Sequence, residues 1–277
     1  MNASDGLILG IDGGGTKTVA WLARCDFTNK SDVTNTMKII GRGRSGSSNV
    51  RGVGFETALD HLNQAVERAF ADDALPVLYA ASPDGIGIAL IAGTGSLALG
   101  QNANGDRARC GGWGSLLGDE GSGYQISLAA LRAAVRAEDG RGPSTQLLER
   151  LLDHHGIASA SELIPILHAD PNNRIMIASL APLVFDVAAS GDPVATQIID
   201  QASTDLAEMA KTLADRLDMS TQPCSLAGTG SVLIHQPAFT QRIREKLAEA
   251  GIETNYRAIP ESVAGTLMIA AGSMTTH

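Results

Sequence analysis

The chain has 277 residues, of which 44% are hydrophobic and 18% are charged, and its formal net charge is −9. This length can bury a large core and predicts two domains, while the composition is ordinary for a soluble globular protein. The acidic balance, without a basic stripe in the sequence, argues against nucleic acid and anionic membranes as partners.

The N-terminus and the cysteines predict a cytoplasmic protein. Residues 1–5 lack the basic region and apolar stretch of a signal peptide. No apolar run approaches the roughly 20 residues that a membrane-spanning helix needs. Cys25, Cys110 and Cys224 are scattered, odd in number and form no CxxC pair, which favours reduced thiols.

The first part of the chain predicts strands followed by a helix. Apolar runs indicate strands at 7–11, 18–23 and 37–41, with a glycine-rich turn at 12–17 and a polar loop at 42–49. A helix is expected over residues 56–70, because helical spacing places four apolar residues on one face: Leu59, Leu62, Val66 and Phe70.

The rest of the chain predicts a strand, a run of helices and a strand–turn–helix. An apolar strand is expected at 86–92, a helix at 122–136, and a short helix from Ser144, as its N-cap, to Leu152. Further helices are expected at 161–168, 174–190, from the Asp192-Pro193 start signal to about Leu217, at 240–250 and from 261, with a strand at 224–227. This order predicts an α/β fold with two lobes and a cleft between them.

Three glycine-rich turns, at residues 13–16, 93–96 and 228–231, each come directly after an apolar run. Glycine lets backbone N–H groups converge, so such turns can cradle an anion, and together they indicate a polyphosphate. Asp12 beside the first turn could hold hydrated Mg²⁺ against the phosphates; the plainer alternative is a hairpin turn with a solvated aspartate. The Walker pattern GxxxxGK[ST] does not occur, and the first turn leads into a strand, which disfavours P-loop and GxGxxG nucleotide binding.

Four stretches carry a family resemblance: GIDGGGTKT at 10–18, IAGTGS at 91–96, CGGWG at 110–114 and GDEGS at 118–122. They resemble the actin-like ATPase and sugar kinase superfamily, and more closely the BadF/BadG/BcrA/BcrD ATPase family with its N-acetylglucosamine kinases. The resemblance implies a two-lobed, ribonuclease H-like α/β fold with an interlobe cleft. Residues 1–83 with 261–277 would form the N-terminal lobe and residues 84–260 the C-terminal lobe.

The resemblance implies an ATP-dependent kinase that phosphorylates N-acetylglucosamine or glucosamine at the 6-hydroxyl, with Asp73 as the base, Mg²⁺ at Asp12, and a homodimer. The nucleotide would be held by Asp12, Gly13, Gly14, Gly15, Thr16, Lys17, Gly93, Thr94, Gly95, Ser96, Gly228, Thr229 and Gly230. The sugar would be held by Asn49, Asp73, Gly111, Gly112, Trp113 and Asp119.

The chain departs from the family before Asp73. Family members carry a strand, a helix and a strand between the first helix and the catalytic aspartate, whereas here Ala71 runs straight into Asp72. A remodelled lobe, a natural deletion that impairs ligand binding, and an error in the sequence all remain open. A ligand-binding remnant of a kinase is therefore one alternative function, and an activating ATPase of a dehydratase, disfavoured by the scattered cysteines, is another.

Some of these residues also have plainer interpretations. Asp119-Glu120 could cap the following helix, and Trp113 could be a core residue instead of a platform for the sugar. His154-His155 are expected on a solvated surface and not at a metal site, and Cys110 is expected to be a packed side chain.

Overall fold

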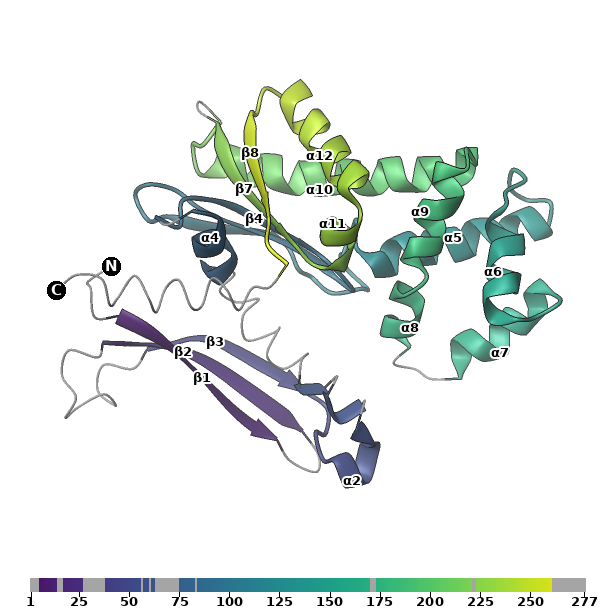
Figure 1. Ribbon diagram of the computed structural model, residues 1–277, viewed down its shortest axis with the longest axis horizontal. Helices are drawn as coiled ribbons and strands as arrows, with labels where there is room; N and C mark the ends of the chain where they lie inside the picture. Colours follow the sequence, from purple (N-terminus) through teal and green to yellow (C-terminus); the bar gives the residue numbers. More distant parts are fainter. Residues whose placement is uncertain are drawn as a thin grey trace. The chain divides into compact units, whose positions relative to one another are not determined.

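The computed structural model describes residues 5–13, 17–26, 38–55, 57–59, 61–62, 75–82, 84–169, 173–220 and 223–260 (Figure 1). The chain divides into two compact units, one within residues 1–86 and one formed by residues 87–260. The predicted helix from residue 261, and most of the one predicted at 56–70, lie outside the described residues.

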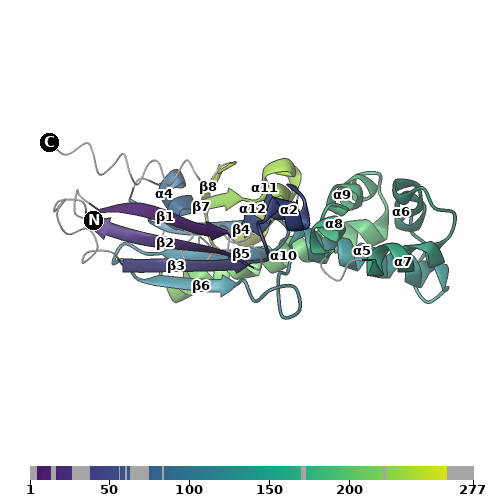
Figure 2. The same cartoon turned by 90° about the horizontal axis from the view of Figure 1, so that it is seen from below.

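The first unit contains a three-stranded antiparallel sheet in the order β1-β2-β3 (Figure 2). Its strands are β1 (Asp5–Gly13), β2 (Thr18–Asp26) and β3 (Lys38–Ser45). The predicted hairpin is confirmed, but the loop predicted at 42–49 begins too early. Arg42 and Arg44 are exposed and Gly43 is buried, which is the alternation of a strand, and β3 therefore continues to Ser45.

Two short helices follow this sheet in the first unit, α2 (Val50–Val53) and α4 (Leu75–Ala81). Between them, residues 57–59 and 61–62 are helical, as predicted. The predicted apolar face is wrong at Leu59, whose side chain is 47% exposed, whereas the neighbouring Ala58 is buried. Leu62, on the same predicted face, is half-buried, and Val66 and Phe70 lie outside the described residues.

The second unit is built on a five-stranded sheet in the order β6-β5-β4-β7-β8. The strand β5 is antiparallel to its neighbours β4 and β6, whereas β7 is parallel to β4 and β8 is parallel to β7. The strands are β4 (Gly87–Ala92), β5 (Ser96–Gln101), β6 (Arg107–Gly111), β7 (Cys224–Thr229) and β8 (Thr254–Ala258). The apolar runs at 86–92 and 224–227 predicted β4 and β7, whereas β5, β6 and β8 were not predicted.

Helices flank this sheet: α5 (Gly123–Glu138), α6 (Leu147–His155), η1 (Ala160–Glu162), α7 (Leu163–His168), α8 (Arg174–Ala178), α9 (Ala181–Ala189), α10 (Pro193–Arg216), α11 (Ser231–His235) and α12 (Pro237–Glu249). The helix α10 packs across β4, β5 and β6 (Figure 1). Its buried residues Leu206, Ala210 and Leu213 share one core with Ile88 and Leu90 of β4. This core supports β4 and β7, whose ends carry the second and third glycine-rich turns.

The start of α10 at Asp192 is confirmed, and two other helix predictions are corrected. The helix predicted at 174–190 is two helices, because Pro182 lies in the first turn of α9 and cannot continue α8. The helix predicted from Ser144 begins at Leu147, where the Thr145 hydroxyl accepts from the Leu147 N–H at 3.2 Å and donates to the Asp192 carboxylate at 2.9 Å.

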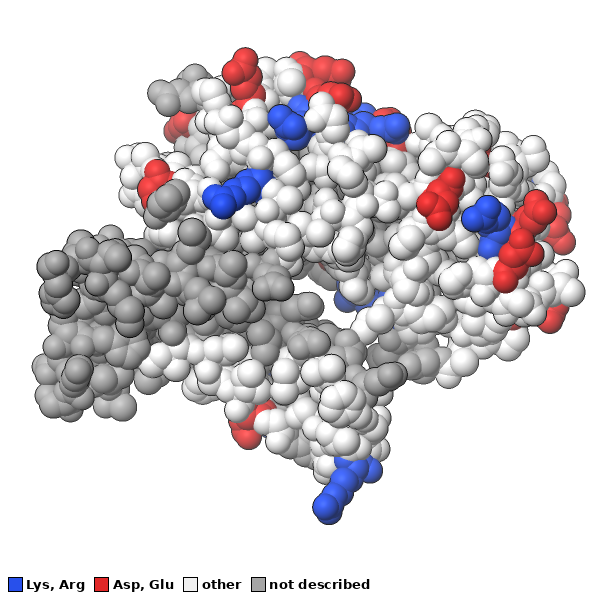
Figure 3. Space-filling view, viewed as in Figure 1, with Lys and Arg blue, Asp and Glu red and all other residues white. Residues whose placement is uncertain are grey.

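In the described residues no single helix is long and apolar enough to cross a membrane. The helical stretches Arg174–Ala189 and Pro193–Arg216 pass that test only as a pair, and they are bent by 119° relative to each other. On the face drawn in Figure 3, acidic and basic side chains of the second unit are interspersed. The described part of that face therefore carries no continuous basic surface.

Candidate functional site

The second glycine-rich turn, Gly93–Ser96, is the tip of the β4–β5 hairpin. The Gly93 N–H donates to the Gly95 carbonyl at 2.9 Å, and the Gly93 carbonyl accepts from the Gly123 N–H at 2.8 Å. Among the described residues, no hydrogen-bond partner faces the amides of Thr94 and Gly95. The turn is thus anchored at its first residue and has two backbone donors available for an anion.

Asp119 is buried beneath this turn. Its Oδ1 accepts from the Ser96 N–H at 3.2 Å, and the Ser96 hydroxyl donates to the Glu120 carbonyl at 2.7 Å. A Cβ added at Gly95 would lie 2.9 Å from the same Oδ1, so a side chain there would displace the carboxylate. Asp119 also has a positive φ of 62°, a conformation that non-glycine residues rarely adopt.

Ser122, and not Asp119 or Glu120, caps helix α5. The Ser122 side chain accepts from the Gln125 N–H at 3.2 Å, which is the bond expected of an N-cap residue. The capping interpretation of the Asp119-Glu120 pair is therefore wrong, and the Asp119 carboxylate is directed at the glycine-rich turn instead.

Arg174 of α8 is the ionic partner of Asp119. Its Nη2 lies 2.5 Å from Asp119 Oδ2, and its guanidinium lies 5.6 Å from the ring centroid of Tyr124 in α5. The two members of the ion pair are 55 residues apart in the chain. Sequence reasoning missed Arg174, because no local motif marks an arginine in a five-residue helix remote from the glycine-rich segments.

Gly111 and Gly112 lie beside the same turn. Both have positive φ values, 74° and 72°, and the Gly112 N–H donates to the Ser96 carbonyl at 3.1 Å. A Cβ at Gly111 would lie 2.9 Å from the Met209 sulfur. The end of β6 is therefore restricted to glycine on steric grounds. These two glycines place the predicted sugar segment against the predicted phosphate turn.

The loop after Gly112 is closed by a residue that sequence reasoning missed. The Gln125 Nε2 donates to the carbonyls of Ser115 at 3.0 Å and Gly118 at 2.9 Å. The interpretation of Trp113 as a core residue is wrong, since its side chain is 67% exposed and the Arg109 guanidinium lies 5.4 Å from its ring centroid. Loop 113–117 therefore presents an aromatic ring on a fixed backbone.

The third glycine-rich turn adjoins the second. Strand β7 runs to Thr229, two residues beyond the predicted strand, and Gly230 follows with a φ of 91°. The Cβ position of Gly93 lies 3.7 Å from the Ser231 nitrogen. The second and third glycine-rich turns, both predicted to hold the nucleotide, thus lie at one end of this sheet.

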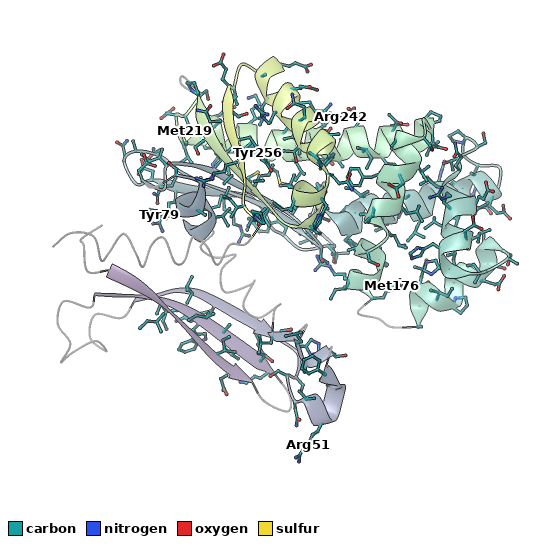
Figure 4. The ribbon with its side chains drawn as sticks, in the orientation of Figure 1. Arg51, Tyr79, Met176, Met219, Arg242 and Tyr256 are labelled. Atoms are coloured by element: carbon teal, nitrogen blue, oxygen red, sulfur yellow. The ribbon has the colours of Figure 1, made fainter. Side chains whose placement is uncertain are left out.

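In the first unit the structure brings Gly13, at the start of the first glycine-rich turn, and Thr18 close to residues 46–48, which precede the predicted sugar ligand Asn49. The Gly13 backbone lies against Ser48, and the Thr18 hydroxyl donates to the Gly46 carbonyl at 2.8 Å. Asn49 caps α2, its Oδ1 accepting from the Arg51 N–H at 3.1 Å; Figure 4 shows Arg51 projecting outward there.

The remaining predicted residues of the first unit fall into two groups. Asp12 and Lys17 are exposed at the strand ends that flank the turn. Gly14, Gly15, Thr16 and Asp73 lie outside the described residues. Their roles therefore remain predictions from the sequence.

In the described part of the chain, no group of three or more His, Cys, Asp or Glu side chains is arranged to hold a metal ion. His154 and His155 contact edge to face, with ring centroids 5.0 Å apart. Cys110 and Cys224 are free thiols, and burial raises the pKa of Cys224 to about 11. A thiol with so high a pKa remains protonated at neutral pH, which makes it a poor nucleophile or metal ligand.

The strand order of the second unit and the three glycine-rich turns define an α/β protein with the actin-like ATPase fold. Residues 67–270 match the BadF/BadG/BcrA/BcrD ATPase family, and the chain belongs to that family.

Two relatives share part of this sequence. The chain is 37% identical over 147 residues to the N-acetylmuramic acid/N-acetylglucosamine kinase of Clostridium acetobutylicum. The match covers 53% of this chain and 48% of that protein. It is 31% identical over 192 residues to the N-acetyl-D-glucosamine kinase of Dictyostelium discoideum. This match covers 68% of this chain and 60% of that protein. The matched part thus spans about half to three fifths of the length of these relatives.

Two solved structures have a similar fold. A proposed N-acetylglucosamine kinase from Chromobacterium violaceum aligns with a TM-score of 0.56 at 22% identity, covering 95% of this chain and 99% of that one. A second from Porphyromonas gingivalis aligns with a TM-score of 0.57 at 18% identity, covering 98% of this chain and 100% of that one. At this level of identity, the similarity establishes the fold.

Proposed function

We propose that this protein is an ATP-dependent amino-sugar kinase that phosphorylates N-acetylglucosamine or glucosamine at the 6-hydroxyl. The observation that carries the proposal is the hydrogen-bond network at Ser96, which joins the turn at 93–96 to Gly112 and Asp119. The segment for which we propose phosphate binding and the one for which we propose sugar binding thereby contact each other in one unit. The names of the two partial relatives support a kinase that acts on N-acetylglucosamine.

The reaction needs phosphate donors and a base for the sugar hydroxyl. The free amides of Thr94 and Gly95 would donate to phosphate oxygens. Asp73 would accept the proton of the 6-hydroxyl as its oxygen bonds to the γ-phosphorus and the bond to the departing ADP oxygen breaks. Phosphoryl transfer depends mainly on such positioning and on charge neutralisation.

Asp12 fits the part of a Mg²⁺ ligand. It is a single exposed carboxylate beside the first turn, and Mg²⁺ commonly binds through one or two carboxylates, substrate phosphates and several waters. When bound, Mg²⁺ would offset the negative charge of the phosphates. Asp12 would hold it, and Lys17 across the turn would supply a second positive charge.

Other predicted residues would bind the sugar and the adenosine. The Asn49 side-chain oxygen is occupied by its helix cap, which leaves its amide nitrogen to donate to a sugar hydroxyl. Trp113 offers an exposed ring for the apolar face of a sugar. Gly228 to Gly230 would contact adenosine, where the absence of side chains allows close approach.

One observation favours a second candidate, a protein that binds these ligands without turnover. The described residues of the first unit hold a three-stranded sheet, whereas those of the second hold five strands. A strand–helix–strand segment that delivers the catalytic aspartate is expected in the family and is not found between Ala71 and Asp72 in the sequence. Such a chain would retain the Ser96 network and could still bind nucleotide.

The deciding experiment measures ADP release from Mg-ATP by purified protein whose folding is checked by circular dichroism, with and without N-acetylglucosamine or glucosamine. Sugar-stimulated release establishes the kinase. Binding of Mg-ADP without stimulated release establishes the second candidate. Failure to bind nucleotide overturns both, and iron and colour in protein purified without oxygen would identify a dehydratase activator instead.

A further inference from the structure

The Asp119 carboxylate lies in a position that is unfavourable for phosphate binding unless its charge is offset. Its Oδ1 is 3.2 Å from the Ser96 nitrogen and 2.9 Å from the Cβ position of Gly95. The Asp119 side chain is only 5% exposed, so solvent and salt screen its charge poorly. A buried negative charge directly beneath the free amides of Thr94 and Gly95 would repel the phosphates that those amides attract.

Arg174 supplies the opposing charge from a different element. Its Nη2 is 2.5 Å from Asp119 Oδ2, while Oδ1 remains bonded to the turn. The helix α8, marked by Met176 in Figure 4, packs against α5, and the Arg174 guanidinium lies over Tyr124 of α5. The carboxylate therefore keeps its hydrogen bond to Ser96 while the ion pair cancels its charge.

We propose that Arg174 is a positioning residue that neutralises Asp119 and thereby preserves the affinity of the turn at 93–96 for the phosphates of ATP. This inference rests on the proposed function only in that ATP is the ligand of the turn. It gives Asp119 a role at the phosphate turn in addition to the contact with the sugar that the family resemblance implies.

Three variants separate charge from structure. Arg174→Met leaves the Asp119 charge without its partner. Asp119→Asn retains the oxygen that accepts from the Ser96 N–H but has no charge. The double variant Arg174→Met/Asp119→Asn removes both charges and keeps that hydrogen bond. The matched control is Arg141→Met, which removes an exposed arginine paired with Asp139 and changes the net charge by the same amount.

The primary measurement is the dissociation constant of Mg-ADP by calorimetry, with the Tm of each variant recorded alongside. Arg174→Met should weaken Mg-ADP binding about tenfold, and the double variant should restore it to within about threefold of the unaltered protein. Arg141→Met should leave the affinity unchanged. A double variant that binds as weakly as Arg174→Met, at an equal or higher Tm, overturns the inference.

Kinetics provide the second readout. The KM for ATP should rise in Arg174→Met while the KM for the sugar stays constant; the reverse pattern overturns the inference and assigns the pair to the sugar. If the unaltered protein binds Mg-ADP but phosphorylates no sugar, the proposed kinase function fails while the calorimetric test still decides the role of Arg174. If folded protein does not bind Mg-ADP, the phosphate role of the turn and this inference both fail.

Discussion

Gly230 lies directly against the carbonyl oxygen of Ala92, so that the ends of two parallel strands contact each other backbone to backbone. The parallel pairing of β4 with β7 brings Ile91 opposite Thr229, so that both strands end near this contact. Gly230 also has a φ of 91°, which residues with a Cβ rarely adopt. The second and third glycine-rich turns can adjoin each other only because this residue is glycine.

Replacing Gly230 with alanine should therefore destabilise the second unit. The new Cβ would overlap the Ala92 carbonyl as well as strain the backbone, and we expect a loss of about 2–4 kcal/mol in the free energy of unfolding. Urea unfolding measures this loss. The control is Gly251→Ala, where φ is 81° but no atom lies within 4 Å of the new Cβ. Equal losses in the two variants would show that the Ala92 contact contributes nothing.

Asp192 should be the most costly single carboxylate to remove from the second unit. It is buried, and its two oxygens accept from Val194, Ala195, Thr145 and Gln146, which ties the start of α10 to the start of α6. Asp192→Ala should lower the free energy of unfolding by about 2–4 kcal/mol, because it removes a helix cap and leaves buried donors unpaired. Asp200→Ala, an exposed residue of the same helix, should cost much less. Similar urea midpoints for both variants would contradict this.

The same carboxylate should make stability depend on acidic pH. Burial alone would raise the pKa of Asp192, but the hydrogen bonds from Ala195, Gln146, Thr145 and Val194 outweigh it and lower that pKa below 3.8. Because the folded state holds the ionised form, this stabilisation is present above the unfolded pKa and is lost as the pH falls through the folded one. The loss should be visible in urea midpoints measured between about pH 5 and pH 2, and Asp192→Asn should reduce it.

His155 should add a second pH dependence with its own range. Burial, and secondly the charge of His154, lower the pKa of His155 below 6.5, and its Nε2 is buried without a partner in the described part of the chain. The unfolded chain therefore takes up a proton first, and stability should fall as the pH drops below 6.5. His155→Gln should flatten this decline in Tm, whereas His168→Gln, at an exposed helix end, should leave it unchanged. An identical decline in the His155 variant would assign the effect to another group.

The sequence predicted the elements whose signal is local. Asp192-Pro193 marks the start of α10 by capping chemistry, and the apolar run before Gly93 marks β4, because both signals depend on adjacent residues. Strand β6 reads Arg107-Ala-Arg-Cys-Gly111, and its pairing is decided by its antiparallel neighbour β5 and not by its own hydrophobicity. Local patterns carry no such information about partners.

The same difference between local and tertiary signals applies to the candidate site. The glycine-rich turns could be located from the sequence, since glycines after an apolar run have a local steric meaning. Arg174 could not, because its role comes from tertiary packing that brings α8 to Asp119. Likewise, the exposure of Trp113 follows from the path of loop 113–117, which Gln125 fixes from helix α5.

The catalytic role proposed for Asp73 can be tested with the neighbouring Asp72 as the control. Asp73→Asn should reduce sugar-dependent ADP release by about a hundredfold or more, because a carboxamide cannot accept the proton of the sugar hydroxyl. Mg-ADP binding should be unchanged, since the turn at 93–96, for which we propose phosphate binding, is held by Ser96, Asp119 and Gly123. Asp72→Asn carries the same change one position earlier, and it should retain most of the turnover. If the two variants exchange these results, Asp72 is the base and the chain before it is displaced by one residue relative to the family. Full turnover in both would remove this pair of aspartates from the mechanism.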